Sequence, residues 1–189
     1  MPLTQPQKDI VKAYIQADPV LSVKTPSAQS AYDIAQALMV VAAGPFYVYR
    51  TNMPKQEVQD QINYANMTPA QSLTGLTGDA LQQWIAKNLL AQGKQFNLQN
   101  LLLGSDSLNF ALPNIKSGFQ DALTNLPTKS DGTTQAAGWP ALQLKISRPA
   151  SIIEKLLATG TGSQAVPATM GYEGSVNEND IGSVMGWSF

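Results

Sequence analysis

The sequence has no cysteine and no histidine among its 189 residues. Without cysteine there are no disulfides, thiolate nucleophiles or thiolate metal ligands. Without histidine, the commonest general base and metal ligand is missing, so a Ser-His-Asp triad and a Cys-His pair are both excluded. These two absences remove much of the chemistry on which hydrolytic and metal-dependent enzymes rely.

Charged residues are also scarce. They make up 13% of the chain, with a net charge of -1, whereas about 25% is usual for a soluble domain. There is no basic cluster of the kind that a nucleic-acid groove needs to displace counterions. Amides take the place of charges, with 18 glutamines and 11 asparagines. Because amides are buried more easily than charges, this composition favours a subunit of a packed assembly. The alternative is that it has no functional meaning.

Long apolar runs are missing as well. No stretch approaches the roughly 18 residues that cross a bilayer, and the first ten residues lack the apolar core of a signal peptide. We therefore expect no membrane association. Hydrophobic residues nevertheless make up 43% of the chain, which is enough for the core of one domain, alone or with an extension.

Apolar residues recur mostly at helical spacing, which predicts a mainly α fold of six or seven helices with two or three short β-strands. Caps, prolines and glycines set the expected boundaries. The helices are expected near residues 4–18, 27–43, 52–66, 79–103 (with Gly93 ending or bending it), 114–126, 134–146 (with Pro140 marking a kink or a late start) and 151–158. Strands are expected at 46–49 and near 170–172, and Asn177 is expected to cap a final turn.

Residues 160–189 form the most informative segment. It is rich in Gly, Ser, Thr, Asn and Pro, so it should be mobile in a free monomer and ordered only where something holds it. The simplest holder is another protein chain. We therefore predict a helical body at 1–159 and an extended C-terminal interaction tail at 160–189.

Six residues are predicted to bind a partner. Tyr172, Ile181, Trp187 and Phe189 lie in the tail, where desolvated aromatic anchors are typically worth about 2 kcal/mol each. The alternative is that they fold back onto their own body. Tyr47 and Tyr49 lie on one face of a strand whose other face carries Phe46, so the strand needs a cover on both sides, and a neighbouring subunit is one possible cover.

The remaining motifs indicate no chemistry. The thirteen acids mostly stand singly on helix faces, so paired-carboxylate glycosidase chemistry stays only formally open. Gly160–Ser163 lacks the lysine of a phosphate-binding loop. Residues 106–109 and 177–180 are oxygen-rich but do not match a calcium loop. We therefore predict no catalytic, cofactor-binding or metal-binding residues, and no enzyme.

Four segments resemble a group of small uncharacterised proteins of tailed bacteriophages and prophages. They are FYVYRTNMPKQEV (46–58), AQGKQFNLQNLLLG (91–104), NIKSGFQDALTNLP (114–127) and LLATGTGSQAVPATMGYEGSVNENDI (156–181), and together they cover roughly half of the chain in the same order. Tyr49 stands where that group commonly has tryptophan, and the ending at 187–189 departs from its pattern. The resemblance implies a virion or assembly protein and transfers no functional residue.

The leading hypothesis is a structural subunit of a tailed-phage virion, assembled in the host cytoplasm, that forms a homo-oligomeric ring as a head–tail connector (neck or adaptor) on the portal. Its tail would lie on the next subunit, the portal or another virion protein. The alternatives are a capsid decoration or minor head protein, a tail component, a non-virion assembly chaperone or host-factor-binding protein, and a lytic glycosidase.

Overall fold

The computed structural model describes residues 2–67, 74–127 and 136–189. The chain is mainly helical, with 52% of residues in helices, eight α-helices and four short strands in two small antiparallel sheets within these ranges. The predicted fold class is confirmed. The contacts divide the chain into two compact units: unit 1 is Met1–Tyr49 with Ser147–Phe189, and unit 2 is Arg50–Ile146. This division differs from the predicted boundary at residue 160.

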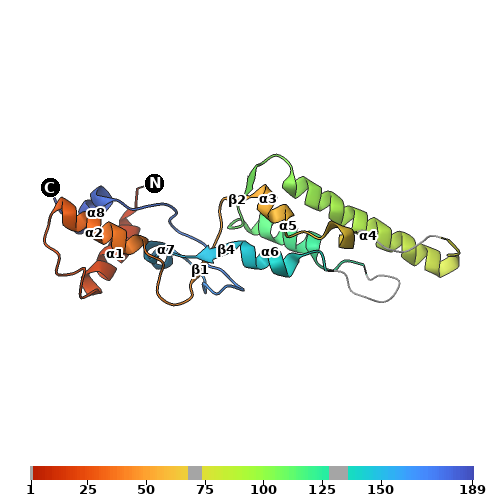
Figure 1. Cartoon of the computed structure of the whole chain (residues 1–189), viewed down its shortest axis with the longest axis horizontal. Helices are drawn as coiled ribbons and strands as arrows, with labels where there is room; N and C mark the ends of the chain where they lie inside the picture. Colours follow the sequence, from red (N-terminus) through yellow and green to blue (C-terminus); the bar gives the residue numbers. More distant parts are fainter. Residues whose placement is uncertain (1, 68–73, 128–135) are drawn as a thin grey trace. The chain divides into compact units, whose positions relative to one another are not determined.

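Unit 1 contains four helices and one two-stranded sheet (Figure 1). In chain order the elements are α1 (Gln5–Ala17), α2 (Ala28–Met39), β1 (Tyr47–Tyr49), β4 (Ser147–Pro149), α7 (Ile152–Leu157) and α8 (Glu178–Met185). The chain leaves this unit after Tyr49 and returns to it at Ser147.

Local capping explains where these helices begin. Thr4, Ser27, Ser151 and Asn177 are the N-caps, in three cases with the side chain accepting a bond from the amide three residues on, which satisfies a donor that the helix leaves free. The C-terminal boundary of the second helix was predicted less well. The helix ends at Met39 instead of Ala43 because the next residues turn into backbone pairing, where the Ala42 amide donates to the Ala150 carbonyl at 2.9 Å.

The sheet of unit 1 pairs β1 with β4, and a third segment lies beside β1. Val48 is opposite Arg148 in the antiparallel register. On the other edge, the Ala168 amide donates to the Tyr47 carbonyl at 2.8 Å, and the Tyr49 amide donates to the Ala168 carbonyl at 3.1 Å. Residues 170–172 form no strand, contrary to prediction, because the pairing is confined to isolated bridges at Ala168 and Thr169.

The segment at 160–189 is part of the unit 1 core. Tyr172, Val176, Ile181 and Val184 are buried in one cluster with residues of α1, α2 and α7. Thus the segment has little core of its own but completes the core of α1 and α2. Tyr172 and the partly buried Trp187 fold back onto their own body, which is the alternative stated above for the aromatic residues of this segment.

Unit 2 contains the longest helix and the second sheet. Its elements are β2 (Met53–Pro54), α3 (Lys55–Gln59), a 3-10 turn η1 (Tyr64–Met67), α4 (Gly78–Leu102), β3 (Ser107–Leu108), α5 (Pro113–Leu123) and α6 (Trp139–Lys145). Phe110 and Phe119 are fully buried, with ring centroids 5.3 Å apart.

The helix predicted at 52–66 is wrong as a single element. Met53 and Pro54 are extended because they pair with Leu108 and Ser107 in β2–β3, so a helix begins only at Lys55 and ends at Gln59. The Asn63 amide then donates to the Ala137 carbonyl at 3.1 Å. These distant pairings interrupt a pattern that looks helical locally.

Two other boundaries are resolved by the structure. The predicted helix neither ends nor bends at Gly93, because α4 is one continuous helix of 25 residues that includes this glycine. Pro140 marks a late start, because α6 begins at Trp139 with the proline in its first turn, where its missing N–H costs nothing. The predicted helix start at 134 lies outside the described residues. Along the described ranges, no helix is both long and apolar enough to cross a bilayer.

Candidate assembly surface

Three of the six predicted partner-binding residues lie inside unit 1. Ile181 is fully buried, and Tyr49 and Tyr172 are nearly so. The Tyr172 hydroxyl donates to the Ser175 carbonyl at 2.9 Å, so its polar atom is satisfied within its own segment. These side chains stabilise unit 1, and no partner reaches them while the unit stays closed.

The other three predicted residues remain partly accessible. Tyr47 is half-buried in β1 and Trp187 is half-buried against the unit 1 core. Phe189 is 54% exposed, with its ring lying over Gly182, where an added Cβ would come within 3.0 Å of it. They do not form one continuous apolar surface with the three buried residues.

A larger apolar surface lies in unit 2, on α4. One face of this helix is buried through Ala91, Lys94, Leu98 and Leu102. The ammonium group of Lys94 caps the end of α5 by donating to the Asp121 carbonyl, and it pairs with the Asp121 carboxylate at 3.3 Å. This face holds α4 against α5, and Figure 1 shows the N-terminal half of α4 extending past α5 and α6.

The opposite face of α4 carries three exposed apolar residues, and a fourth follows at the C-cap of the helix. Ile85, Leu89 and Phe96 are 44%, 62% and 62% exposed, and the C-cap residue Leu103 is 70% exposed. At 3.6 residues per turn these positions fall within about 40° of one another, and roughly 150° from the centre of the buried face. We call them the outer stripe. A helix that is apolar on two opposite faces normally has a partner on each.

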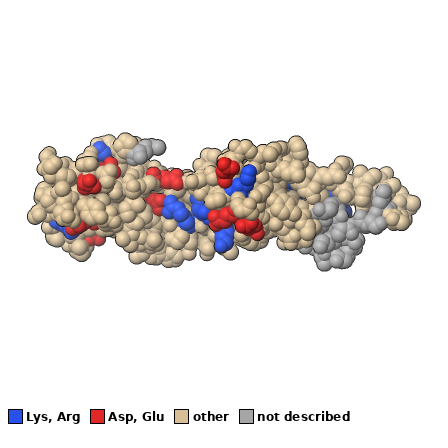
Figure 2. All heavy atoms as spheres, turned by 45° about the horizontal axis from the view of Figure 1, so that its top comes forward, with Lys and Arg blue, Asp and Glu red and all other residues tan. Residues whose placement is uncertain are grey.

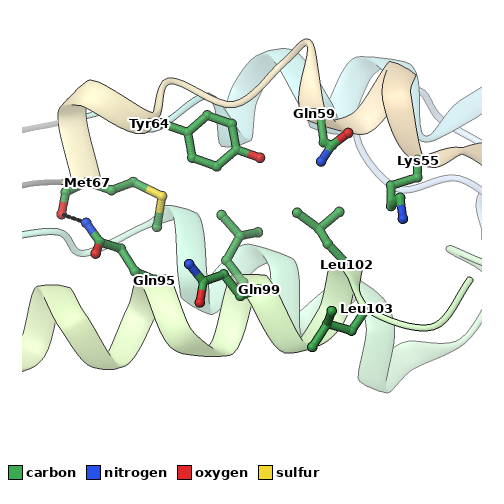
Figure 3. Close-up of a pocket in the computed structure, with 9 residues that line it drawn as sticks. Lys55, Gln59, Tyr64, Met67, Gln95, Gln99, Leu102 and Leu103 are labelled. Atoms are coloured by element: carbon green, nitrogen blue, oxygen red, sulfur yellow. Dashed lines mark hydrogen bonds between the residues drawn. The ribbon is translucent and has the colours of Figure 1, made fainter.

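A groove opens beside the C-terminal half of α4. It has a volume of about 600 Å³, and the described residues that line it are Lys55, Gln59, Tyr64, Met67, Gln95, Leu98, Gln99, Leu102 and Leu103. Figure 3 shows the Tyr64 ring and Gln59 facing the side chains of α4 across it, with Lys55 at the end near Leu103. One wall is fixed by the Gln95 side-chain amide, which donates to the Met67 carbonyl at 3.0 Å.

The lining of the groove suits binding of an uncharged group. Its described floor and rim are leucine, methionine and amide side chains, with Lys55 as the single charged group. Burial raises the pKa of the Tyr64 phenol, and the hydrogen bond with Gln59 only partly offsets this, so the hydroxyl stays protonated at physiological pH. In Figure 2 the charged side chains gather away from the end formed by the N-terminal half of α4, whose visible described atoms are almost all uncharged.

The outer stripe alone provides a limited driving force. Covering four half-exposed side chains is worth roughly 1 kcal/mol each, whereas association costs about 4–15 kcal/mol in lost freedom. A contact that uses only the stripe is therefore weak. A stable contact needs the groove as well, or several copies acting together.

Sequence reasoning missed the outer stripe. Ile85, Leu89, Phe96 and Leu103 recur at spacings of four, seven and seven. That pattern becomes visible only when the helix is continued through Gly93, whereas the sequence predicts that the helix ends or bends at this glycine.

Unit 1 has a separate polar cluster around Glu154. Its carboxylate accepts two bonds from Arg148, at 2.6 and 2.8 Å, and one from the Ser151 amide at 2.9 Å. Burial would raise the pKa of Glu154, but these hydrogen bonds outweigh it and hold the pKa below the ordinary glutamate value. The cluster joins β4 to the start of α7 and has the geometry of a structural ion pair.

This cluster predicts an acid-sensitive unit 1. Because the folded state lowers the Glu154 pKa, the charged form contributes stability above the ordinary pKa of about 4.3, and this contribution is lost as the pH falls through the lower folded value. We expect Glu154→Gln to cost about 1 kcal/mol at neutral pH, since Arg148 is partly solvated, and to flatten the loss of stability in acid. Urea unfolding followed by Trp187 fluorescence in a Trp84→Phe, Trp139→Phe background measures it.

Glu57→Gln is the matched control. Glu57 forms a similar two-bond pair with Arg50, at 2.6 and 2.8 Å, but in unit 2. It should leave the Trp187 transition unchanged. If the stability of the Glu154→Gln variant fell as steeply in acid as that of the parent, this result would contradict the role given to Glu154.

No protein-family model, curated protein or solved structure matches the chain. Within the described ranges, no group of three or more acidic side chains is placed to hold a metal ion.

Proposed function

We propose that the chain is a structural subunit of a tailed-phage virion that assembles as a ring at the head–tail connector. The observation that carries the proposal is the outer stripe of α4, a second apolar face on a helix whose first face is already packed. An exposed apolar face of this kind promotes aggregation of an isolated protein, whereas a subunit can bury it in a contact with another chain.

Two further observations support this function. The low content of charged residues reduces the cost of desolvating a subunit interface. The four segments that resemble tailed-phage proteins include residues 91–104, which cover the C-terminal half of α4 with Phe96 and the C-cap residue Leu103. The groove and the stripe are binding features, and the proposal assigns them to protein–protein contact.

Quantitative mass spectrometry of purified virions tests this proposal. A ring of closed cyclic symmetry at the connector predicts about twelve copies per particle. Hundreds of copies would place the subunit in the capsid or the tail and overturn the connector location. Absence from particles, with the protein present in the infected cell, would overturn a virion function altogether.

A further inference from the structure

The N-terminal half of α4 is only partly covered in the part of the chain that the structure describes. Leu81, Trp84, Lys87 and Asn88 are half-buried, but none of residues 78–90 is fully buried, and Gly93, a poor helix former, follows this half. An isolated helix of about a dozen residues is marginal in water, because nucleation is costly and few bonds repay it. A contact on the exposed side that carries Ile85 and Leu89 would add packing to this half of α4.

The C-terminal half of the same helix, in contrast, borders the groove. The groove is a concave site whose described floor is formed by Met67, Leu98 and Leu102 and whose rim carries Gln59 and Gln99. An amide rim over an apolar floor suits an uncharged apolar ridge, because no charge has to leave water.

The ridge formed by Ile85 and Leu89 meets this requirement. Asp79, Lys87 and Lys94 are the charged residues of α4, and at 100° per residue each lies at least about 80° from both Ile85 and Leu89. The ridge therefore presents apolar side chains without charge, and the single lysine of the groove meets no second cation there. Ridge and groove belong to the same helix, so every copy of the chain carries both.

Contact of one outer stripe with the same stripe of another copy fits less well. In a left-handed helix pair, positions seven apart share the seam, so Gln92 and Gln99 would follow Ile85 into it. Two glutamines would then be buried between apolar layers, at a cost in desolvation, whereas Gln59 and Gln99 lie at the rim of the groove, where an amide can keep contact with water. Such pairing would also leave the groove unfilled.

We infer that the Ile85–Leu89 ridge of one copy occupies the α4 groove of a second copy. This inference rests on the proposed function, since it names the contact through which the subunits assemble. Each copy uses its ridge toward one neighbour and its groove toward another, which gives the heterologous contact that closes a ring. A two-fold pair that uses both contacts at once is the other geometry that the same docking permits.

Two variants test the contact separately. Leu89→Lys puts a positive charge on the ridge opposite Lys55, and Gln99→Lys puts one in the groove. Sedimentation velocity over a range of protein concentrations should show association of the parent chain and at least about a tenfold weaker association of each variant. Leu144→Lys is the matched control, because Leu144 is a 55% exposed leucine on α6 of unit 2 and is not among the described residues that line the groove, and it should associate as the parent does.

A mixture of the two variants gives the decisive result. Leu89→Lys keeps a working groove and Gln99→Lys keeps a working ridge, so the mixture should form a 1:1 complex that neither variant forms alone. Stripe-to-stripe contact predicts no such rescue, and its absence would overturn the inference. A parent chain that stays monomeric at every concentration, or a Leu89→Lys variant that associates normally, would overturn it too. Leu89→Ala, which keeps a good helix former, separates lost contact from lost folding.

The outcomes distinguish this inference from the proposed function. Ridge-and-groove association of a chain that is absent from virions would leave the inference standing and remove the virion function. Normal incorporation of Leu89→Lys into virions at parental copy number would do the reverse.

Discussion

Deleting residues 163–189 should unfold unit 1 and leave unit 2 folded. The deletion removes Tyr172, Val176, Ile181 and Val184, all buried in the cluster that also holds α1 and α2. Burial of four such side chains is worth about 6–12 kcal/mol, which matches the whole stability of a typical domain of about 5–15 kcal/mol. We therefore expect far-ultraviolet circular dichroism to show a loss of helix that exceeds the eight residues of α8.

The two tryptophans that remain in the deleted chain make the experiment specific. Trp84 and Trp139 both belong to unit 2, so their fluorescence transition in urea should stay near that of the full chain. Deleting only Ser188 and Phe189 is the control and should change little, because Phe189 is more than half exposed. Ile181→Ala provides a milder variant and should cost about 2–5 kcal/mol in unit 1. A deleted chain with full helix content would mean that the segment is a dispensable tail.

Gly138→Ala should destabilise unit 2 more than other glycine-to-alanine changes in that unit. Gly138 has a φ of 103°, and a Cβ there would lie 1.9 Å from the Gln61 carbonyl oxygen. Neither the backbone nor this oxygen can yield without breaking the contacts of residues 61–66 with 136–138, among them the Asn66 side-chain bond to the Ala136 carbonyl at 2.8 Å. Together the clash and the left-handed strain should cost at least about 3 kcal/mol.

Gly93→Ala in the same unit is the matched control. Gly93 is exposed and helical, with nothing within 4 Å of an added Cβ. The change should stabilise unit 2 by about 0.5–1 kcal/mol, because alanine loses less conformational freedom in a helix. Urea denaturation followed by tryptophan fluorescence compares the two variants. A Gly138→Ala protein within about 1 kcal/mol of the parent would show that residues 61 and 138 separate at little cost.

Local signals in the sequence predicted most helix starts. Asn177 caps a helix as expected, and the helices expected from residues 4, 27 and 151 begin directly after Thr4, Ser27 and Ser151, because a cap depends on residues three positions apart. Pro140 also acts locally, and of its two expected roles the late start is the one observed. The mainly α class followed from the same short-range periodicity.

Most of the failures involve contacts between distant residues. Pairing of Met53 with Leu108 keeps Met53 and Pro54 extended, and the local pattern at 52–66 carries no trace of it. Strand β4 is short and contains Pro149, and it forms because its backbone pairs with β1. Residues 160–189 look disordered by composition, yet Ile181 and Val184 fill a space that α1 and α2 leave open. The outer stripe of α4 was readable in principle, because only a weak helix former at Gly93 hides its regular spacing.

Unit 2 is an insertion in unit 1, placed between the paired strands β1 and β4. Tyr49 lies opposite Ser147 where the chain departs and returns, and the Arg50 amide donates to the Ile146 carbonyl at 2.9 Å just beyond. The two ends of the insert are therefore as close as neighbouring strands, about 5 Å. The geometry of unit 1 therefore does not depend on how many residues lie between these two ends. Insertions, deletions or a complete replacement of unit 2 can then accumulate in evolution while unit 1 keeps its geometry.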